Sequence, residues 1–213
     1  MSEERRTSAA ALASLGEPRP LTGEDVERAA SSIARAFAWH EPWGEWVLPD
    51  PADREQKLVK LVADDLRDRF LSHGECWTIG GACTTVWIPP PSAPGGDVFA
   101  ARRGDEEYAV YGERGAALRA GDELVDGLRP EGDHWYLDTI ATDPRFRRRG
   151  LGARLLDHDL AIRDSRGQSC ALDTHTPENV AFYERRGFRV TADAKLPGGG
   201  PDVYVMVREA GGE

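Results

Sequence analysis

The chain has 213 residues, 40% hydrophobic and 30% charged, and no apolar run approaches the roughly 20 residues of a membrane span. A formal net charge of -10 argues against a nucleic-acid partner, because such binding rests on a positive surface. The three cysteines, Cys76, Cys83 and Cys170, form no CxxC pair. We therefore expect a cytoplasmic protein without disulfides or metal.

Residues 1–18 are predicted to form a flexible leader. They carry acids within the first four positions, small residues and prolines, and no apolar core of a secretory signal. Residues 19–213 then have the length of one domain with a single sizeable core.

The first part of this domain alternates helical and extended patterns. Apolar residues at helical spacing predict a helix capped by Thr22, with Asp25 three positions later, and a second helix after Pro51. Between them, "WHEPWGEWVLPD" is interpreted as an aromatic and acidic loop. "CWTIGGACTTVWI" predicts a hairpin that turns at Gly80-Gly81. After the proline-rich "PPPSAPGG", residues 105–128 are predicted to be helical, in one piece or two.

The C-terminal part has the clearest organisation. "HWYLDTIAT" predicts a strand that ends at Asp143-Pro144, and the following helix is expected to end at Gly167. "CALDT" is a short buried strand, and "TPENVAFYERRG" is a helix with its cap at Thr176 and its stop at Gly187. "FRVTADAKL" and "DVYVMVRE" form a closing hairpin. This order predicts an α/β core with parallel strands in its middle.

The stretch "RFRRRGLGARLL", Arg145 to Leu156, lies between the predicted strand and helix. The first N–H groups of a helix have no partner within it, and the helix dipole favours an anion there. Gly150 and Gly152 allow close approach to the main chain, and the arginines add forked donors. The pattern favours a pyrophosphate, although a plain helix start with a solvated basic face gives a similar sequence.

Two known phosphate loops fit poorly. A P-loop needs a Lys after its glycines, which is missing, and Leu155 stands where a Rossmann loop has its third glycine. Residues 147–152 instead resemble (Q/R)xxGx(G/A), the acetyl-CoA loop of the GNAT N-acetyltransferases. "LDTHTPENVAFYERRGF" resembles the second signature of that family, with Asn179 and Tyr183 on one helix face. Segments such as "FYERRGFRVTAD" and "WYLDTIATDP" resemble its puromycin N-acetyltransferase branch.

The resemblance implies the GNAT fold: a central twisted mixed sheet with bulged and splayed middle strands, flanked by helices. It divides the domain into an acceptor-side half, 19–134, and an acetyl-CoA-binding half, 135–213. It implies acetyl-CoA as the donor and direct transfer without a covalent enzyme intermediate. The residues implied in binding acetyl-CoA are Ile140, Ala141, Thr142, Arg147, Arg148, Arg149, Gly150, Leu151, Gly152, Ala153, Asn179 and Tyr183.

The resemblance implies that Tyr183 protonates the leaving sulfur, whereas a tyrosine on such a helix without this context is more often part of a core. Asp173, where the puromycin branch carries a Glu, is the predicted group that binds or deprotonates the acceptor ammonium; alternatively it caps the nearby helix. His175 has a suitable ring but lies in a predicted loop, where we expect it to be solvated.

The acceptor is expected to contact the segment after the first helix. Aromatic faces and carboxylates suit a cationic, partly apolar amine, while the alternative is that the tryptophans pack the sheet edge. The candidate acceptor-binding residues are Trp39, Glu41, Trp43, Glu45 and Asp138.

The sequence thus predicts an acetyl-CoA-dependent N-acetyltransferase that acts on a small, cationic primary amine. The resemblance adds an aminonucleoside-type antibiotic as the acceptor, and hence a role in antibiotic resistance. A protein N-terminal or lysine acetyltransferase and a CoA-binding sensor without turnover are the alternatives. We expect a monomer or homodimer without nucleic-acid, membrane or metal partners.

Overall fold

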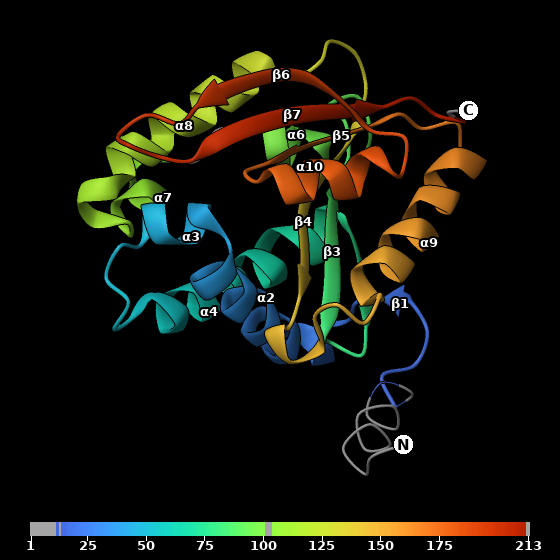
Figure 1. The fold of residues 1–213 in the computed structure, drawn as a ribbon, viewed down its shortest axis with the longest axis horizontal. Helices are drawn as coiled ribbons and strands as arrows, with labels where there is room; N and C mark the ends of the chain where they lie inside the picture. Colours follow the sequence, from blue (N-terminus) through green and yellow to red (C-terminus); the bar gives the residue numbers. More distant parts are fainter. Residues whose placement is uncertain (1–11, 13, 101–103, 212–213) are drawn as a thin grey trace.

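The computed structural model describes residues 12, 14–100 and 104–211, which form an α/β fold around one seven-stranded mixed sheet (Figure 1). The strand order is β1-β2-β3-β4-β5-β7-β6. The bounds are β1 Arg19–Pro20, β2 Glu75–Ile79, β3 Cys83–Ile88, β4 Trp135–Thr142, β5 Cys170–Thr174, β6 Arg189–Lys195 and β7 Asp202–Arg208. Among the strands of the described residues, only β4 and β5 pair in parallel, as predicted for the middle of the sheet.

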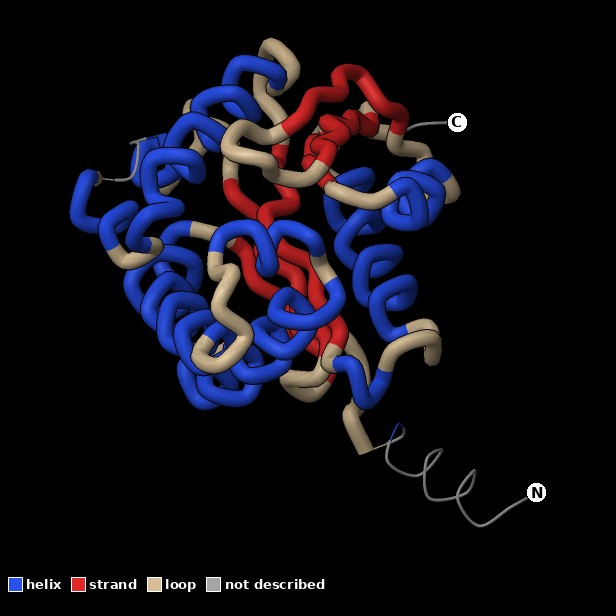
Figure 2. The backbone as a smooth tube through the Cα atoms, turned by 60° about the vertical axis from the view of Figure 1, so that its left-hand side comes forward, coloured by secondary structure: helices blue, strands red, loops and turns tan. Residues whose placement is uncertain are grey.

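Helices cover both faces of this sheet (Figures 1 and 2). Their bounds are α2 Val26–His40, α3 Pro42–Val47, α4 Arg54–Asp65, α5 Leu71–His73, α6 Gly96–Ala100, α7 Asp105–Ala109, α8 Gly115–Leu128, α9 Leu151–Ser165 and α10 Pro177–Glu184. Short helical turns are η1 Gly23–Asp25, the π-helical η2 Leu66–Phe70, η3 Gly112–Arg114 and η4 Pro144–Phe146. Among the helices of these described residues, none combines the length and apolar character that a bilayer span requires.

Alternating side chains of the central strands supply the two cores. Val86 and Ala141 pack in a cluster with residues of α2, α4 and η2 on one face. Trp87 and Leu137 pack in another with residues of α9 and α10. In Figure 1, β3 and β4 run across the direction of β6 and β7, and α10 passes in front of them. Helix α10 therefore packs over the middle of the sheet, where the strand direction changes because the sheet is strongly twisted.

Most local signals of the sequence are confirmed. Thr22 and Asp25 form a capping box before α2, and Thr176 caps α10 by accepting from the Asn179 N–H. Gly80 and Gly81 turn the β2–β3 hairpin with φ values of 55° and 67°. The helical segment 105–128 consists of two main pieces, α7 and α8.

The predicted loop after α2 is partly wrong, because six of its residues form α3, with Pro42 in its first turn. The described end of the predicted leader packs on the domain. Leu15 is buried in a cluster with Ile79 and Leu155, and an Arg154 guanidinium donates to the Gly16 carbonyl. The rest of that predicted leader lies outside the described residues.

The middle of the sheet is bulged and splayed, as the sequence resemblance implied. Val86 of β3 faces Thr139 of β4, but Trp87 faces Leu137, so Asp138 is an extra residue on β4. On its other side, β4 pairs with β5 only from Trp135–Cys170 to Leu137–Leu172. Beyond Leu137 the two strands separate, and the last five residues of β4 lie outside this ladder.

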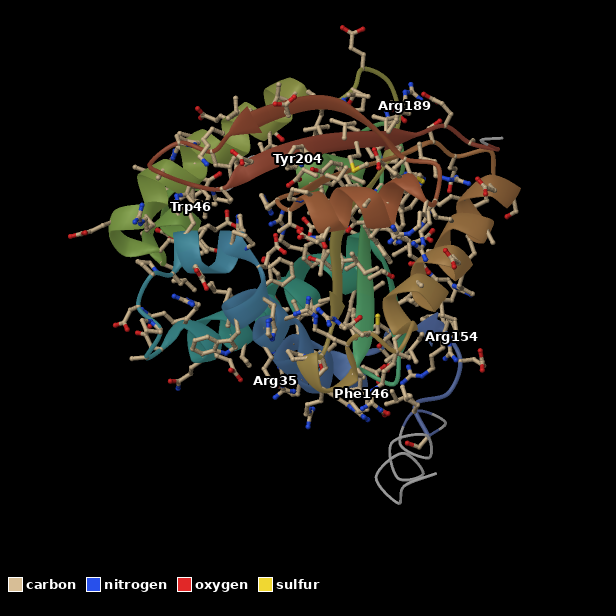
Figure 3. The ribbon with its side chains drawn as sticks, in the orientation of Figure 1. Arg35, Trp46, Phe146, Arg154, Arg189 and Tyr204 are labelled. Carbon is tan, nitrogen blue, oxygen red and sulfur yellow. The ribbon has the colours of Figure 1, made fainter. Side chains whose placement is uncertain are left out.

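Asp143 ties the end of β4 to α2. Its carboxylate is fully buried and accepts hydrogen bonds from Arg35 at 2.9 Å and from the Arg145 side chain and main chain at 2.8–3.0 Å. Arg35 and Phe146 accordingly lie at the same end of the molecule in Figure 3. Burial alone would raise the pKa of Asp143, but the bonds from Arg145 and Arg35 outweigh it and lower the pKa to about 2.

Replacing Asp143 with Asn is expected to lower the free energy of unfolding by about 2 kcal/mol, because Arg35 and Arg145 lose a charged acceptor. Since the folded pKa lies below the ordinary 3.8, the wild type should lose this stability as pH falls from about 4 through about 2. Urea unfolding at pH 7 and pH 3 measures both effects. Asp193→Asn, at an exposed position of β6, is the control; equal results for the two variants would contradict the assignment.

Candidate active site

The loop between β4 and α9 presents a row of main-chain donors. The N–H groups of Gly150, Leu151, Gly152 and Ala153 donate no hydrogen bond within the described residues, and α9 begins with the bond from the Arg154 N–H to the Gly150 carbonyl. Gly150 and Arg148 are in the left-handed region, with φ values of 79° and 58°. Alternating left- and right-handed residues of this kind form anion-binding concavities. The geometry fits the predicted pyrophosphate site.

Arg148 supports this interpretation, because a non-glycine residue at positive φ costs roughly 1–2 kcal/mol. The side chains of Arg147, Arg148 and Arg149 are exposed around the loop. Arg147 also lies close enough to His40, at the end of α2, to lower its pKa together with burial. Backbone strain of this kind clusters at functional sites, and helix initiation alone does not need it.

The loop adjoins the separated end of β4. A Cβ at Gly152 would lie 3.4 Å from Thr142 Oγ1 and 3.9 Å from Ile140 Cδ1, so the bare glycine leaves the main chain close to the strand. Ile140 packs with the α9–α10 cluster, Ala141 faces α2, and Thr142 Oγ1 donates to Cys83 Sγ at 3.2 Å. Thr142 and Ile140 of β4 therefore lie beside Gly152 of the loop, whereas the Ala141 side chain is buried on the opposite face of the sheet.

Tyr183 of α10 lies on the other side of the strand separation. Its ring is buried and packs edge-on against Phe182 and Phe188 at 5.2 and 5.8 Å. Its hydroxyl makes no hydrogen bond within the described residues. Burial, followed by the charges of Glu41 and Asp173, raises its pKa. Tyr183 is therefore held in its protonated form, as a proton donor must be.

Asp173, at the end of β5, is positioned by β4. The Tyr136 hydroxyl donates a hydrogen bond to Asp173 Oδ1. Burial and the neighbouring Asp173 raise the pKa of Tyr136, so this hydroxyl remains a donor. The Arg129 guanidinium stacks 4.0 Å above the Tyr136 ring and pairs with Asp126 at 3.3 Å. Tyr136 and Arg129 are absent from the predicted site residues, since no local pattern marks a contact across parallel strands.

Glu41 connects the two predicted halves of the domain. Its Oε1 lies 3.0 Å from His175 Nδ1, and its Oε2 lies 3.5 Å from Asn179 Nδ2. His175 Nε2 lies 3.6 Å from Asp173 Oδ2. The expectation of a solvated His175 is wrong, because its side chain is only 12% exposed.

A cavity of about 330 Å³ opens beside these groups, within the range of about 300–1,000 Å³ that small-molecule sites occupy. Asp173 and His175 lie at its wall together with residues of α2, α3, α4, α7 and α8. Its described lining carries six carboxylates against three guanidinium groups: Asp65, Asp122, Glu123, Asp126, Asp138 and Asp173 against Arg69, Arg119 and Arg129. Aromatic residues such as Phe37, Trp43, Tyr108 and Tyr111 complete the wall.

The predicted acceptor residues divide into two groups. Trp43 and Asp138 line the cavity, and Trp43 packs edge-on against Phe37 at 6.0 Å. Trp39 is 46% exposed and donates to Glu55 outside the cavity, while Glu45 is exposed on α3. Trp46, buried at the left of Figure 3 under α8, also lines the cavity. Trp43 and Trp46 are three positions apart on α3 and so share its face toward the cavity, whereas Trp39 belongs to α2.

Comparisons with known proteins agree with this geometry. Residues 95–190 match the family model described as an acetyltransferase (GNAT) domain. The peptidyl-lysine N-acetyltransferase YjaB of Salmonella typhimurium is 29% identical over 75 residues, or 35% of this chain and 49% of the relative. The match thus spans about half the length of this curated relative.

Two solved structures share the fold. The histone acetyltransferase HPA2 and related acetyltransferase from Corynebacterium glutamicum has a TM-score of 0.66 at 19% identity, over 92% of this chain and 97% of that one. The C-terminal condensation domain of Ebony, in complex with beta-alanyl-dopamine, has a TM-score of 0.64 at 10% identity, over 91% and 98%. The chain therefore shares its α/β fold with acetyltransferases of known structure, and its residues 95–190 resemble an acetyltransferase (GNAT) domain.

Replacing Arg147 and Arg148 together with Gln is expected to weaken coenzyme A binding about tenfold, because two exposed cations at the anion loop are lost. The decrease of affinity with added salt should also become less steep. Isothermal titration calorimetry at two salt concentrations measures both. Arg189→Gln, on exposed β6 away from the loop, is the control; an unchanged affinity of the double variant would contradict the site.

Proposed function

We propose that the protein is an acetyl-CoA-dependent N-acetyltransferase that acetylates the primary amine of a small, cationic molecule. The observation that carries this proposal is a series of contacts between three features. The N–H groups of residues 150–153 donate no hydrogen bond within the described residues, Gly152 of this loop lies beside Thr142 and Ile140 at the separated end of β4, and Ile140 packs in the same cluster as Tyr183. A pyrophosphate at the loop, an extended thiol arm along β4 and a sulfur near α10 would follow these features in order.

The residues divide the chemistry between them. Main-chain groups of Ile140, Ala141 and Thr142 hold the arm and orient the thioester. Asp173 attracts the acceptor ammonium from the cavity. Tyr183 gives its proton to the leaving sulfur, and its raised pKa favours this protonated form before transfer. In this proposal the acetyl group passes directly to the amine, and no residue of the chain carries it.

The cavity favours a compact acceptor. Residues of α4, α7 and α8 line the space together with several aromatic side chains. An aromatic, cationic amine matches this lining in both charge and shape. We include aminonucleoside antibiotics of the puromycin type in this class, because the sequence resembles that branch. The Ebony domain, bound to beta-alanyl-dopamine, supports the proposal only as evidence that this fold accommodates a small amine derivative.

A protein lysine is the second candidate acceptor. It is favoured by the likeness to the peptidyl-lysine N-acetyltransferase of Salmonella typhimurium. A lysine side chain would enter the cavity from its mouth, and the polypeptide around it would need an open surface there. A small amine would bind inside the cavity instead. The two candidate acceptors therefore differ in whether they need an open surface at the mouth of the cavity.

Measurement of thiol release from acetyl-CoA across a panel of amines distinguishes a small-molecule acceptor from a protein lysine. The panel comprises puromycin, aromatic monoamines, polyamines, lysine peptides and peptides with free N-termini. We expect the highest kcat/KM for the aromatic cationic amines. Equal or faster reaction of lysine peptides would favour the second candidate. Coenzyme A binding without turnover on any amine would indicate a sensor.

Tyr183→Phe should lower kcat by about 100-fold, because loss of a general acid typically costs 10²–10⁴-fold in rate. Coenzyme A affinity should change little, since the ring and its packing against Phe182 and Phe188 are retained. Steady-state kinetics and calorimetry measure the two quantities. Tyr204→Phe, on β7, is the matched control. An unchanged kcat for Tyr183→Phe would remove Tyr183 from the mechanism.

A further inference from the structure

His175 lies between two carboxylates at the wall of the acceptor cavity. Glu41, at the junction of α2 and α3, approaches Nδ1 to 3.0 Å, and Asp173 of β5 approaches Nε2 to 3.6 Å. The side chains of His175, Glu41 and Asp173 are 12%, 15% and 22% exposed. A ring held this way is not a freely solvated surface group, and the acid chemistry assigned to Tyr183 does not use it.

Glu41 fixes which nitrogen carries the proton of the neutral ring. An ionised carboxylate only accepts hydrogen bonds, so the contact at 3.0 Å requires a proton on Nδ1. The second oxygen of Glu41 faces Asn179 Nδ2 at 3.5 Å, which helps to hold the carboxylate in this orientation. In the neutral ring, Nε2 then presents a lone pair on the side of Asp173.

Asp173 also presents an acceptor at this point. Its Oδ1 receives the Tyr136 hydroxyl, which leaves Oδ2 facing His175 Nε2. At 3.6 Å, these two atoms are too far apart for a direct hydrogen bond and close enough for one donor group to bind both. An ammonium has three N–H donors and a positive charge, so it satisfies both acceptors at once.

We propose that His175 Nε2 removes the proton from the acceptor ammonium, while Asp173 binds that ammonium and Glu41 stabilises the imidazolium that forms. This inference rests on the proposed function. An alkylammonium has a pKa of roughly 10, and imidazole is ordinarily a stronger base than a carboxylate by roughly 2.5 pH units. A histidine backed by a carboxylate therefore suits the deprotonation better than Asp173 alone.

The proton balance is complete with the groups present. One N–H bond of the ammonium breaks, its electron pair stays on nitrogen, and the proton bonds to Nε2 and later passes to solvent. The neutral amine attacks the thioester carbonyl carbon, and the C–S bond breaks. Tyr183 protonates the sulfur, and the second proton lost by the nitrogen as the amide forms restores the Tyr183 hydroxyl.

Several other charged or titratable groups surround this centre. Tyr136 lies behind Asp173, with Arg129 stacked on its outer face. Asp138 of β4 lines the same cavity, and Tyr183 of α10 is near both Glu41 and Asp173. Each of these can affect the pH dependence, so the test relies on the difference between the wild type and single variants.

His175→Gln is expected to lower kcat about 100-fold while leaving coenzyme A affinity unchanged by calorimetry. The pH profile of kcat/KM should lose one ionisation on its acidic side, and the rate should continue to rise toward the pKa of the free amine. His158→Gln is the matched control. His158 also lies beside a carboxylate, Asp159 at 3.1 Å, and lies outside the described lining of the cavity.

Two further measurements separate base catalysis from a structural role. Imidazole added to His175→Ala should restore part of the lost rate, whereas it should not restore Asp173→Asn, which we expect to raise the KM for the amine about tenfold. Nitrogen NMR of the histidine rings in the unliganded protein should show the proton of neutral His175 on Nδ1. In Glu41→Gln this preference should disappear.

The outcomes distinguish this inference from the function on which it rests. If the wild type transfers acetyl to no amine of the panel, the proposed function fails. If the wild type is active and folded His175→Gln matches it in kcat and pH profile, only the role of His175 fails. A neutral His175 protonated on Nε2, or a rate of His175→Ala that imidazole leaves unchanged, would also overturn that role.

Discussion

The separation of β4 from β5 after Leu137 and Leu172 is the constraint on which the site depends. Two parallel strands that continued side by side would fill the middle of the sheet and satisfy each other's main-chain groups. The bulge at Asp138 turns β4 instead, and Ile140 and Thr142 reach the start of α9. The same divergence places Asp173 and His175 at a cavity wall rather than inside a ladder. The proposed binding sites for the acetyl donor and for the acceptor amine thus both adjoin the separation of these two strands.

The loop proposed to bind the pyrophosphate is flanked by buried polar interactions. Arg148 at positive φ stores roughly 1–2 kcal/mol, which the surrounding structure must offset. Asp143 is well suited to this, since its buried carboxylate binds Arg35 of α2 as well as the main chain and side chain of Arg145. The N–H groups that follow can then remain without internal partners. The hydrogen bonds of Asp143 beside the loop can therefore offset the backbone strain at Arg148.

The sequence predicts the features that depend on neighbouring residues. Thr22, Thr176 and the glycine pair at 80–81 act through contacts a few positions away, so their elements follow from local pattern. Helix α3 escaped prediction because six residues containing Pro42 and Gly44 show no helical periodicity. The contact between Glu41 and His175 joins positions 134 apart, and Tyr136 meets Asp173 only through strand pairing. Such contacts require the fold itself.

The position of Glu41 links the two halves of the domain in one polar contact. It belongs to the acceptor-side segment, yet it holds His175 and Asn179 of the other half. If the partly buried Glu41 carboxylate lost its contacts with His175 and Asn179, its desolvation cost would no longer be compensated. The contacts therefore stabilise the position of the α2–α3 junction against α10. Trp43 follows Glu41 by two positions in the first turn of α3, so a change in the aromatic wall at Trp43 can also move the Glu41 carboxylate. The cavity wall and the contact with His175 are therefore coupled through the start of α3.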